Sequence, residues 1–512
     1  MLRFNDTACR FFTIKLLLLC VLITTQCSLN AQSYDITSFG AKADGVTDNT
    51  AAIQKAIDEC SKTGGKVIFP AGTYLSGTLI LKSNTTLHLS AGATLLGSAD
   101  LKAYPYLDAG IRFYGDQWAR QSLIFCRDQD NVSIEGLGTI DGQGAKFPVT
   151  TTKKPDRYKN RPYLLWFSGS RNITVRDVHL RNSAFWMQHY LGCEYVNIDG
   201  IKIWNHSNKN NDMMDIDGSK FVNISNVIGD SDDDGITIKS TSPIISEHIT
   251  ITNCVISSHC NALKFGTEST GGFRNVTVSN CVIKPSRQTT TIYGKPAGNG
   301  GLALEMVDGG IMENISIDNI VIEGPQVPIF VRLGNRARKY MDAAEAPPLG
   351  RMKNIRLSNI TATGADTIGC SISGIEKAQI EQISLSNINI ETVGGGTAKS
   401  VGYTVEEKEA EYPEGTMFGH LPAYGLFIRH AKEVTLSNVI IRSKDLDTRP
   451  GIVVDNVNQF SFLGLDIQSS GKTNSVVQVV KSRNGVIKNS LKHYSSKSFV
   501  QKDKLSINVI SE

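Results

Sequence analysis

The chain has 512 residues, of which 40% are hydrophobic and 20% charged, with 46 Gly and 15 Pro. These values lie in the ordinary globular range and exclude a collagen-like chain, a long coiled coil and general disorder. The 53 basic and 49 acidic side chains leave a net charge of +4. That charge is too small for this length to indicate a nucleic-acid or anionic-membrane surface, so neither partner is expected.

Residues 1–31 have the pattern of a cleavable secretion signal. Three basic residues are followed by an apolar run at 16–23 and then by a short polar stretch. The run is far shorter than the roughly 20 residues of a membrane-spanning helix, so a retained anchor is less favoured. A lipid anchor at Cys27 is also disfavoured, because Gln26 is bulkier than the residue that usually precedes a lipidated cysteine. We expect a secreted or periplasmic protein without a membrane span.

The cysteines do not form a recognisable framework. Ten are present, three of them in the leader, and the other seven are an odd number at scattered positions. No cluster of His and Cys has the spacing of a zinc site, and small buried side chains explain these cysteines better. We therefore expect neither a structural metal nor a cofactor.

The first element expected after the leader is an amphipathic helix at 49–62. Asn49 and Thr50 supply a capped start, and apolar residues recur at helical spacing. These apolar residues are Ala52, Ile53, Ala56 and Ile57. We expect the helix to cover one end of the repeat that follows, because an open end would expose core and unpaired backbone.

A ten-residue phrase recurs ten times between 171 and 467. Examples are EYVNIDGIKI at 194, KFVNISNVIG at 220 and EHITITNCVI at 247. These starts are 26 and 27 residues apart, and longer intervals elsewhere indicate loop insertions. A fixed period of this length is typical of a solenoid.

Within each phrase, β-branched apolar residues alternate with polar ones, and Asn or Asp follows where a turn is needed. Stacking such coils about 4.8 Å apart joins inward Ile and Val into one core. The repeat predicts an all-β fold, a single-stranded right-handed parallel β-helix over 32–512 with an N-terminal cap over about 32–100. Four asparagines at one repeat position are expected to form a ladder along the turns: Asn226, Asn253, Asn280 and Asn319.

Aspartates crowd the segment 210–239. They are Asp212, Asp215, Asp217, Asp230, Asp232, Asp233 and Asp234. Asp212 and Asp233 are 21 residues apart, about one coil, so we expect them on neighbouring coils of one face. Like charges this close raise some carboxyl pKa values, and a protonated carboxyl beside an ionised one serves glycoside hydrolysis. Calcium binding and solvated turn aspartates are the alternatives.

Neighbouring coils add polar residues to this groove. The phrase SSHCNALKFG holds His259 and Asn261, and strand alternation turns Lys239 and Lys264 outward. Acids, a histidine and lysines together suit a polar, hydroxyl-rich and anionic substrate. His259 is expected to be catalytic, with a purely structural hydrogen bond as the alternative.

Several motifs together resemble glycoside hydrolase family 28, the polygalacturonase-like pectin hydrolases, over nearly all of the mature sequence. They are FGAKADGVTDNTAAIQKAI at 39, GTIDGQG at 138, RPYLLWF at 161, NSAFWMQH at 182, NND at 210 and DDGITIKS at 233. The resemblance implies that Asp234 is the general acid and that Asp212 and Asp233 activate the attacking water, with inversion.

The chain departs from the family pattern at two places. The family histidine position falls on Asn261, and His259 lies two residues early. The Arg-x-Lys pair that grips a substrate carboxylate in polygalacturonases falls on Ala303 and Glu305, so both positive charges are missing. Because a buried carboxylate without a cation costs several kcal/mol, ordinary homogalacturonan cleavage is disfavoured.

Other residues are expected to bind the substrate instead. Arg332 lies one coil beyond Ala303, and with Lys239 and Lys264 it is expected to recognise a uronate in another subsite. Glu305 is alternatively expected to bond the hydroxyls of a neutral sugar such as rhamnose, or to be a solvated surface acid. Asp215, Asn261 and His189 are further substrate-binding candidates, and Trp186 is either a sugar platform or core.

The leading prediction is an inverting galacturonidase that acts on rhamnogalacturonan-type polysaccharide or oligosaccharide. A polysaccharide lyase on the same fold and a noncatalytic carbohydrate-binding β-helix are the competing interpretations. Pectic carbohydrate is the expected partner, and the protein is expected to be a monomer. The polar, acidic segment 401–420 breaks the repeat and is expected to be a long loop beside the groove.

Overall fold

The computed structural model describes residues 32–116, 118–397, 399–401, 403–468, 470–491, 493 and 496–512. The secretion signal expected at 1–31 therefore lies outside the described residues. Within the described part, no helix is both long enough and apolar enough to cross a membrane. The seven described cysteines are all buried and free, so the expectation that they form no disulfide framework is confirmed.

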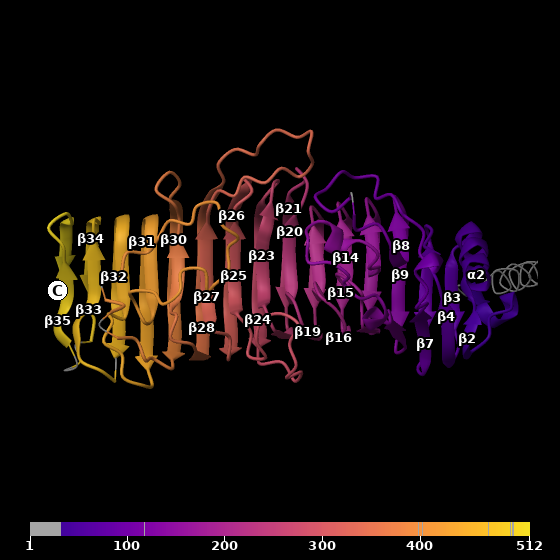
Figure 1. The fold of residues 1–512 in the computed structure, drawn as a ribbon, viewed down its shortest axis with the longest axis horizontal. Helices are drawn as coiled ribbons and strands as arrows, with labels where there is room; N and C mark the ends of the chain where they lie inside the picture. The colour runs from indigo at the N-terminus through magenta and orange to yellow at the C-terminus, as the bar shows by residue number, and fades with distance from the viewer. Residues whose placement is uncertain are drawn as a thin grey trace, which may run out of the picture.

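The chain winds into a stack of coils whose strands pair in parallel on three faces (Figure 1). The first face contains β1 (Ser33–Asp35), β3 (Gly65–Phe69), β6 (Thr85–Leu89), β9 (Asp130–Gly136), β12 (Arg171–Arg176), β15 (Glu194–Asp199), β18 (Lys220–Ser225) and β21 (Ser246–Thr252). The second face contains β2 (Asp44–Asp48), β4 (Gly72–Ser76), β7 (Ala93–Gly97), β10 (Thr139–Asp141), β13 (His179–Arg181), β16 (Lys202–Asn205), β19 (Ile228–Ser231) and β22 (Val255–Ser258).

The third face follows the second after a turn in each coil. It contains β5 (Leu79–Ile80), β8 (Ser122–Arg127), β11 (Tyr163–Ser168), β14 (Gln188–Leu191), β17 (Met214–Asp217), β20 (Ile236–Ser240), β23 (Asn261–Ser269), β25 (Gly300–Met306), β27 (Val327–Leu333) and β29 (Cys370–Ser373). Farther along, single long strands run through two faces or more: β24 (Phe273–Ile283), β26 (Ile311–Glu323), β28 (Arg351–Ala365), β30 (Ile380–Thr392), β31 (Leu426–Ser443) and β32 (Ile452–Gln468). The last coils use β33 (Thr473–Val480), β34 (Arg483–Lys488), β35 (Ser496–Lys502) and β36 (Ile507–Ser511).

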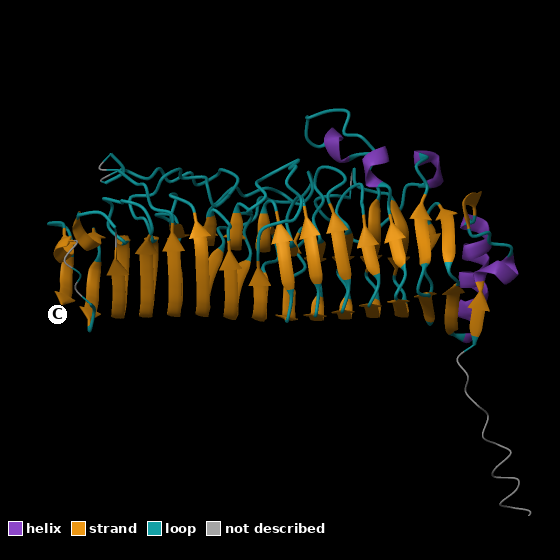
Figure 2. Cartoon of the chain, turned by 90° about the horizontal axis from the view of Figure 1, so that it is seen from below, coloured by secondary structure: helices purple, strands orange, loops and turns teal. Residues whose placement is uncertain are grey.

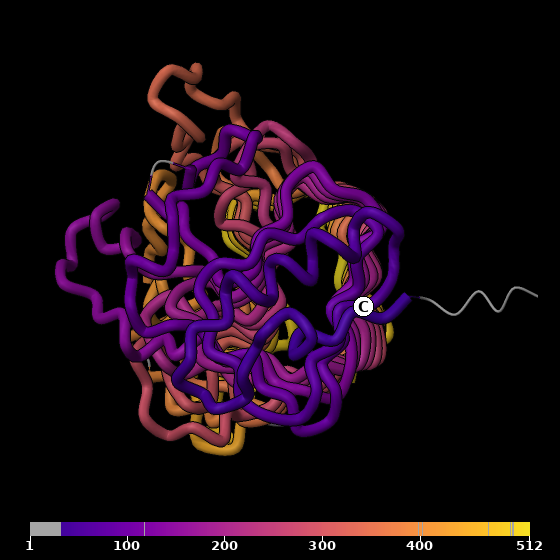
Figure 3. Tube along the Cα trace, turned by 90° about the vertical axis from the view of Figure 1, so that its right-hand side faces the viewer, coloured from indigo at the N-terminus to yellow at the C-terminus, as the bar shows by residue number. Residues whose placement is uncertain are grey.

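The alternation read from the sequence is what fills the interior. Ile173 pairs with Val196 and Val175 with Ile198 between β12 and β15, and all four side chains are buried. Viewed along its axis, the stack repeats nearly the same cross-section from coil to coil (Figure 3). The prediction of an all-β, right-handed parallel β-helix is confirmed.

The predicted asparagine ladder is present in part, because the Asn280 amide donates to Thr252 Oγ1 at 3.4 Å and not to Asn253. Asn280 and Asn319 have the left-handed backbone that the turn needs, with φ of 55° at each, and the Asn319 amide donates to Asn280 Oδ1 at 2.8 Å. Asn387 donates to Asn359 in the same way at 2.9 Å. The ladder therefore satisfies side-chain amides along one turn, as expected for a structural role.

The amphipathic helix α2 (Thr50–Thr63) lies at the N-terminal end of the stack (Figure 2). Its inward side chains are buried: Ile53, Ala56, Ile57 and Cys60. The cap differs from the expected one, because the Asn49 side chain bonds to the backbone of Lys42 instead. Asp48 supplies the acceptor, and its Oδ1 lies 2.9 Å from the Thr50 backbone nitrogen.

The remaining helical segments are single turns in loops. They are η1 (Ile36–Phe39), η2 (Leu101–Ala103), η3 (Gly144–Lys146) and η4 (Asp156–Tyr158). Figure 2 shows that the long loops gather along one flank of the stack while the opposite side is bare strand. The loops on this flank build the walls of the site described next.

Candidate active site

A cavity of about 350 Å³ lies where the turns after the second face meet the third face. Its lining includes Asp212, Asp233, Asp234, Lys239, Trp186 and Tyr412. The backbone of Met213 donates to the carbonyl of Asp234 at 2.9 Å, which sets Asp212 level with the Asp233–Asp234 pair on the adjoining coil. The expectation that these aspartates occupy neighbouring coils of one face is confirmed.

Two of the three aspartates lie in surroundings that favour the protonated form. Burial, with the negative charge of Asp234, raises the pKa of Asp233 to about 7. Burial, with the charges of Asp215 and Asp233, holds the pKa of Asp212 well above its usual range. Asp233 nonetheless accepts hydrogen bonds from the Asp234 backbone at 3.0 Å and from the Asn210 amide at 3.4 Å.

Asp234 has different surroundings, because three donors point at it. Its Oδ1 accepts from the backbone nitrogen of Asn261 at 3.2 Å and from the Asn261 side-chain amide at 2.9 Å. Its Oδ2 lies 3.0 Å from Lys264 Nζ. An ionised carboxyl group accepts hydrogen bonds on both of its oxygens, which is the arrangement seen at Asp234. Asn261 contacts this carboxyl group but does not line the cavity, so the substrate contact predicted for it is corrected to a supporting position.

The two lysines of the site are each surrounded by carboxylates. Lys239 Nζ lies 3.5 Å from Asp212, 3.4 Å from Asp215 and 3.5 Å from Glu268. It also lies 4.4 Å from the centre of the Trp186 ring, so Trp186 forms part of the cavity wall and is not core. Although burial disfavours a charged lysine, these acids hold the pKa of Lys239 well above its ordinary value.

Lys264 is similarly engaged. Besides Asp234, its Nζ lies 3.5 Å from Glu305 Oε2 and 3.1 Å from the Tyr412 hydroxyl. These neighbours compensate its charge inside the protein. The two lysines therefore pair with carboxyl groups of the protein. The expectation that they recognise a uronate is not supported by these contacts.

Glu305 and Ala303 are completely buried and do not line the cavity. Burial raises the pKa of Glu305 to about 8, even with Lys264 nearby. The Glu305 oxygens have no hydrogen-bond partner among the described residues. The alternative in which Glu305 bonds sugar hydroxyls is therefore not supported, since Glu305 is buried away from the cavity.

Asp215 and His189 lie below the cavity floor. Asp215 is fully buried, and burial raises its pKa to about 8 despite the nearby Lys239. His189 Nε2 lies 3.0 Å from Asp217 Oδ2, and its ring packs among Phe113 and other aromatic side chains. Neither residue lines the cavity, so the predicted substrate contacts are corrected to supporting positions.

Arg332 is also fully buried, and it anchors a loop. Its guanidinium donates to Ser373 Oγ at 3.0 Å and to the carbonyls of Glu407 and Lys408 at 2.6 and 3.2 Å. The predicted uronate contact is wrong for this reason. The loop itself was correctly expected beside the groove, because Tyr412 and its neighbour Glu414 line the cavity.

His259 does not reach the cavity. Its Nδ1 lies 2.8 Å from Asp232 Oδ1, and its Nε2 lies 2.8 Å from the carbonyl of Gln288. The ring is fully buried on the far side of the turn that carries Asp233. The predicted catalytic role is therefore corrected, since both ring nitrogens are engaged in protein contacts.

Loop residues that the sequence reasoning missed complete the walls. Trp118, Tyr158 and Tyr293 supply aromatic surface, and Lys154 and Arg157 supply positive charge. Among the described residues, neither of these two cations forms an ion pair. The only hint in the sequence is the basic and aromatic run TTKKPDRYKNRPY before β11.

Arg338 and Glu268 form another missed element of the wall. Arg338 donates to Glu268 at 2.6 Å, and its guanidinium lies 3.5 Å from the centre of the Tyr114 ring. The arginines at 336 and 338 and Lys239 hold the pKa of Glu268 well below its usual range against the effect of burial. The positive charge of Arg338 is therefore compensated by Glu268 within the protein.

A second hollow, of about 500 Å³, lies on the outer side of β13, β16, β19 and β22. Its only carboxylate among the described lining residues is Asp230, which accepts from Ser286 and from the Arg287 backbone. Since hydrolysis of a glycosidic bond needs two carboxyl groups, we assign the active site to the cavity at Asp233.

Known proteins resemble the chain over most of its length. An exo-poly-alpha-D-galacturonosidase of Dickeya chrysanthemi is 28% identical over 355 residues, which cover 59% of this chain and 58% of that relative. The match therefore spans less than two thirds of the length of that protein.

Solved structures share the fold. The hyperthermoactive exopolygalacturonase of Thermotoga maritima gives a TM-score of 0.62 at 24% identity and covers 80% of this chain and 91% of its own. The family 28 exopolygalacturonase of Yersinia enterocolitica gives 0.58 at 19% identity, covering 94% and 78%. The model of the family described as Glycosyl hydrolases family 28 matches residues 60–409. The chain thus belongs to glycosyl hydrolases family 28.

Proposed function

We propose that the protein is an inverting exo-acting galacturonidase that removes terminal galacturonate from pectic oligosaccharides. One observation carries the proposal: Asp233, with a pKa raised to about 7, adjoins Asp234, which accepts from three donors in the same cavity. A proton donor beside a carboxylate is the pair that glycoside hydrolysis requires.

The roles that these surroundings support differ from the sequence-based assignment. Asp233 is the better general acid, because it holds a proton near neutral pH and can deliver it to the leaving oxygen. Asp234 then serves to deprotonate the attacking water, which Asp212 on the adjoining coil helps to position. The donors from Asn261 and Lys264 hold both oxygens of the Asp234 carboxyl group in place for this role.

The shape of the cavity supports attack at a chain end. Its volume of about 350 Å³ is that of a small-molecule pocket rather than of a long open groove. Loop residues close over it: Tyr412 and Glu414 line it together with Lys154 and Arg157, and Lys154 Nζ lies 5.9 Å from the centre of the Tyr412 ring. The relatives from Dickeya chrysanthemi and Thermotoga maritima are themselves named as exo-acting enzymes.

Lys154 and Arg157 are the groups we propose for binding the substrate carboxylate. Both line the cavity, and neither is paired with a described acid, whereas Lys239, Lys264 and Arg338 are. The Arg157 Nε has no hydrogen-bond partner among the described residues. Lys154 and Arg157 supply the positive charge of the family's Arg-x-Lys pair from a different position. In this chain, Ala303 and Glu305 stand where that pair would be.

Because the Arg-x-Lys pair of polygalacturonases is missing, we propose oligosaccharides of rhamnogalacturonan type as the preferred substrates. The test is product analysis with the purified protein on homogalacturonan and rhamnogalacturonan oligosaccharides, alongside Asp233→Asn. Release of saturated galacturonate, lost in the variant, supports the proposal. Unsaturated products would replace it with a lyase, and binding without products with a carbohydrate-binding protein. Faster release from homogalacturonan would overturn the choice of substrate but not the reaction.

We also propose that the protein acts outside the cytoplasm. The support is the leader pattern at 1–31, with basic residues before a short apolar run. Mass determination of the protein recovered from the periplasm or medium tests this, because an uncleaved amino terminus would contradict it.

A further inference from the structure

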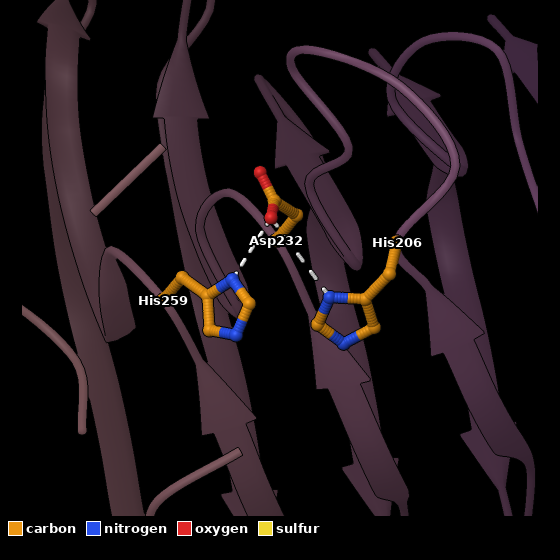
Figure 4. A group of neighbouring side chains, drawn as sticks. All are labelled: His206, Asp232 and His259. Carbon is orange, nitrogen blue, oxygen red and sulfur yellow. Dashed lines mark hydrogen bonds and ion pairs between the residues drawn. The ribbon is translucent and has the colours of Figure 1, made fainter. Parts of the chain in front are cut away.

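Three polar side chains on successive coils converge behind the active site (Figure 4). Asn205 pairs with Ser231 and Ser231 with Ser258 across β16, β19 and β22. The residue after each of these is His206, Asp232 or His259, so the three occupy one rung position. Their ligating atoms all lie within 4.8 Å of one another.

Second contacts fix the tautomer of both rings. His206 Nε2 lies 2.9 Å from Asp230 Oδ1, and His259 Nε2 lies 2.8 Å from the Gln288 carbonyl. Each partner is an acceptor, so each Nε2 carries a proton and donates it. A histidine that binds a metal usually donates its other ring N–H to a carboxylate or carbonyl, as both histidines do here.

The Nδ1 atoms that remain are directed at Asp232. His259 Nδ1 lies 2.8 Å from Asp232 Oδ1, and His206 Nδ1 lies 4.0 Å from the same oxygen. The His206 side chain is 1% exposed, yet its Nδ1 has no hydrogen-bond partner among the described residues. A buried nitrogen lone pair facing a carboxylate is unfavourable unless a proton or a cation lies between them.

We propose that His206 Nδ1, His259 Nδ1 and one oxygen of Asp232 bind a divalent transition metal ion of the zinc class. Two imidazoles and a carboxylate suit zinc and exclude calcium or magnesium, which take oxygen ligands. Zinc–nitrogen bonds of 2.0–2.1 Å would place tetrahedral ligand atoms ~3.3 Å apart, between the two separations that exist now. The sequence spacing hid this site, because its ligands are 26 and 27 residues apart, one coil each.

The site is structural, and it organises the loop at 284–300. Asp232 also accepts from the backbone of Ile292 at 2.8 Å and of Tyr293 at 3.0 Å. Tyr293 lines the active-site cavity, and Asp233 is the next residue after Asp232. None of the three ligands lines that cavity, so the ion would hold the loop and the turn without touching substrate.

The proposal is independent of the proposed hydrolysis, so it is tested by metal binding in the inactive Asp233→Asn variant as well as in the wild type. Chelator-stripped protein is titrated with zinc and followed by calorimetry and thermal unfolding. We expect one equivalent to bind and the unfolding midpoint to rise by several degrees. His206→Gln should abolish both effects, whereas His248→Gln, at an exposed position on β21, should leave them unchanged.

Cobalt(II) provides a second readout on unaltered protein, which does not depend on the folding of His206→Gln. Cobalt bound by two imidazoles and a carboxylate gives visible absorption that zinc removes by competition. Absence of stoichiometric zinc binding and of this absorption would overturn the site. The histidines would then serve only as hydrogen-bond partners of Asp230 and Asp232, and retention of zinc by His206→Gln would equally exclude His206 as a ligand.

Discussion

The side-chain amide of Asn261 donates to Asp234 Oδ1 across adjoining coils at 2.9 Å, while Lys264 holds the other oxygen at 3.0 Å. The carboxylate that would activate water is therefore held from both sides. Its orientation depends on a neutral amide at the position where the family pattern has a histidine. This relationship makes Asn261 a positioning residue whose effect can be measured.

Asn261→Ala should lower kcat about 10–100-fold and change KM little, because a hydrogen bond to a charged group contributes about 1.5–3 kcal/mol. Steady-state kinetics on the released galacturonate check this. Asn223→Ala, at an exposed position on β18, serves as the control. A kcat within twofold of wild type for Asn261→Ala would show that Lys264 alone positions Asp234.

Asp233 should give the enzyme an alkaline limit. Its pKa of about 7 means that the proton needed by the leaving group is present below that pH and lost above it. The rate should therefore fall as pH rises through about 7. Asp233→Asn should lower the rate on oligosaccharides about 10²–10⁴-fold and remove this limb.

A substrate with an activated aryl leaving group distinguishes the two roles. Such a group departs without protonation, so it should restore much of the activity of Asp233→Asn. Asp234→Asn should not be restored, because the attacking water still lacks its base. The opposite pattern would return the acid role to Asp234, as the sequence motif alone suggested.

The repeat predicted the fold because each phrase encodes one strand, one turn and one inward row of side chains. For the same reason the one-coil spacing of Asp212 and Asp233 predicted their meeting across coils. The phrase does not encode side-chain direction in the turns. His259 lies two residues before Asn261, and that offset turns its ring to Asp232 while Asn261 reaches Asp234.

Loop contacts were harder to foresee for a physical reason. Arg332 lies on a strand that faces the groove, yet a loop about 75 residues later covers it and takes its hydrogen bonds. Lys154 and Arg157 come from an irregular insertion, so no period relates them to the aspartates. Strand periodicity places residues on a face, whereas loop closure decides which of them remain accessible.

Glu305 should make stability depend on pH. Its pKa is about 8 in the folded protein, so the folded state retains a proton that the unfolded chain releases near 4.5. The folded state therefore binds more protons between these values, and stability falls as pH rises from about 4.5 to about 8. Glu305→Gln cannot ionise and should escape this loss, which is of the order of 5 kcal/mol.

Thermal unfolding of the wild type and Glu305→Gln at several pH values checks the sign. The advantage of the variant should be small near pH 4.5 and grow by several degrees toward pH 8. Glu313→Gln, on the partly exposed outer side of β26, controls for the loss of a carboxylate. A difference that stays constant with pH would mean that Lys264 keeps Glu305 ionised throughout.

Lys154→Met should raise KM for a galacturonide about 10–100-fold, since it removes an ion pair of about 1.5–3 kcal/mol with the substrate carboxylate. The kcat should change less, and hydrolysis of the matching neutral galactoside should hardly change. Lys153→Met is the matched control, because Lys153 is the neighbour of Lys154 in the sequence and its side chain is exposed. Equal losses on the acidic and neutral substrates would show that Lys154 shapes the cavity without recognising charge.

Tyr412 should determine which part of a chain enters the cavity. Its ring forms one wall and its hydroxyl lies 3.1 Å from Lys264 Nζ, so Tyr412→Ala opens the site toward Glu305. We expect the share of monomer among early products to fall and longer products to appear, measured by chromatography of a defined oligosaccharide. Tyr403→Ala, in the same loop but outside this cavity, should keep the wild-type profile. Unchanged monomer release by Tyr412→Ala would place the barrier to internal chain segments at other lining residues, such as Trp118 and Tyr158.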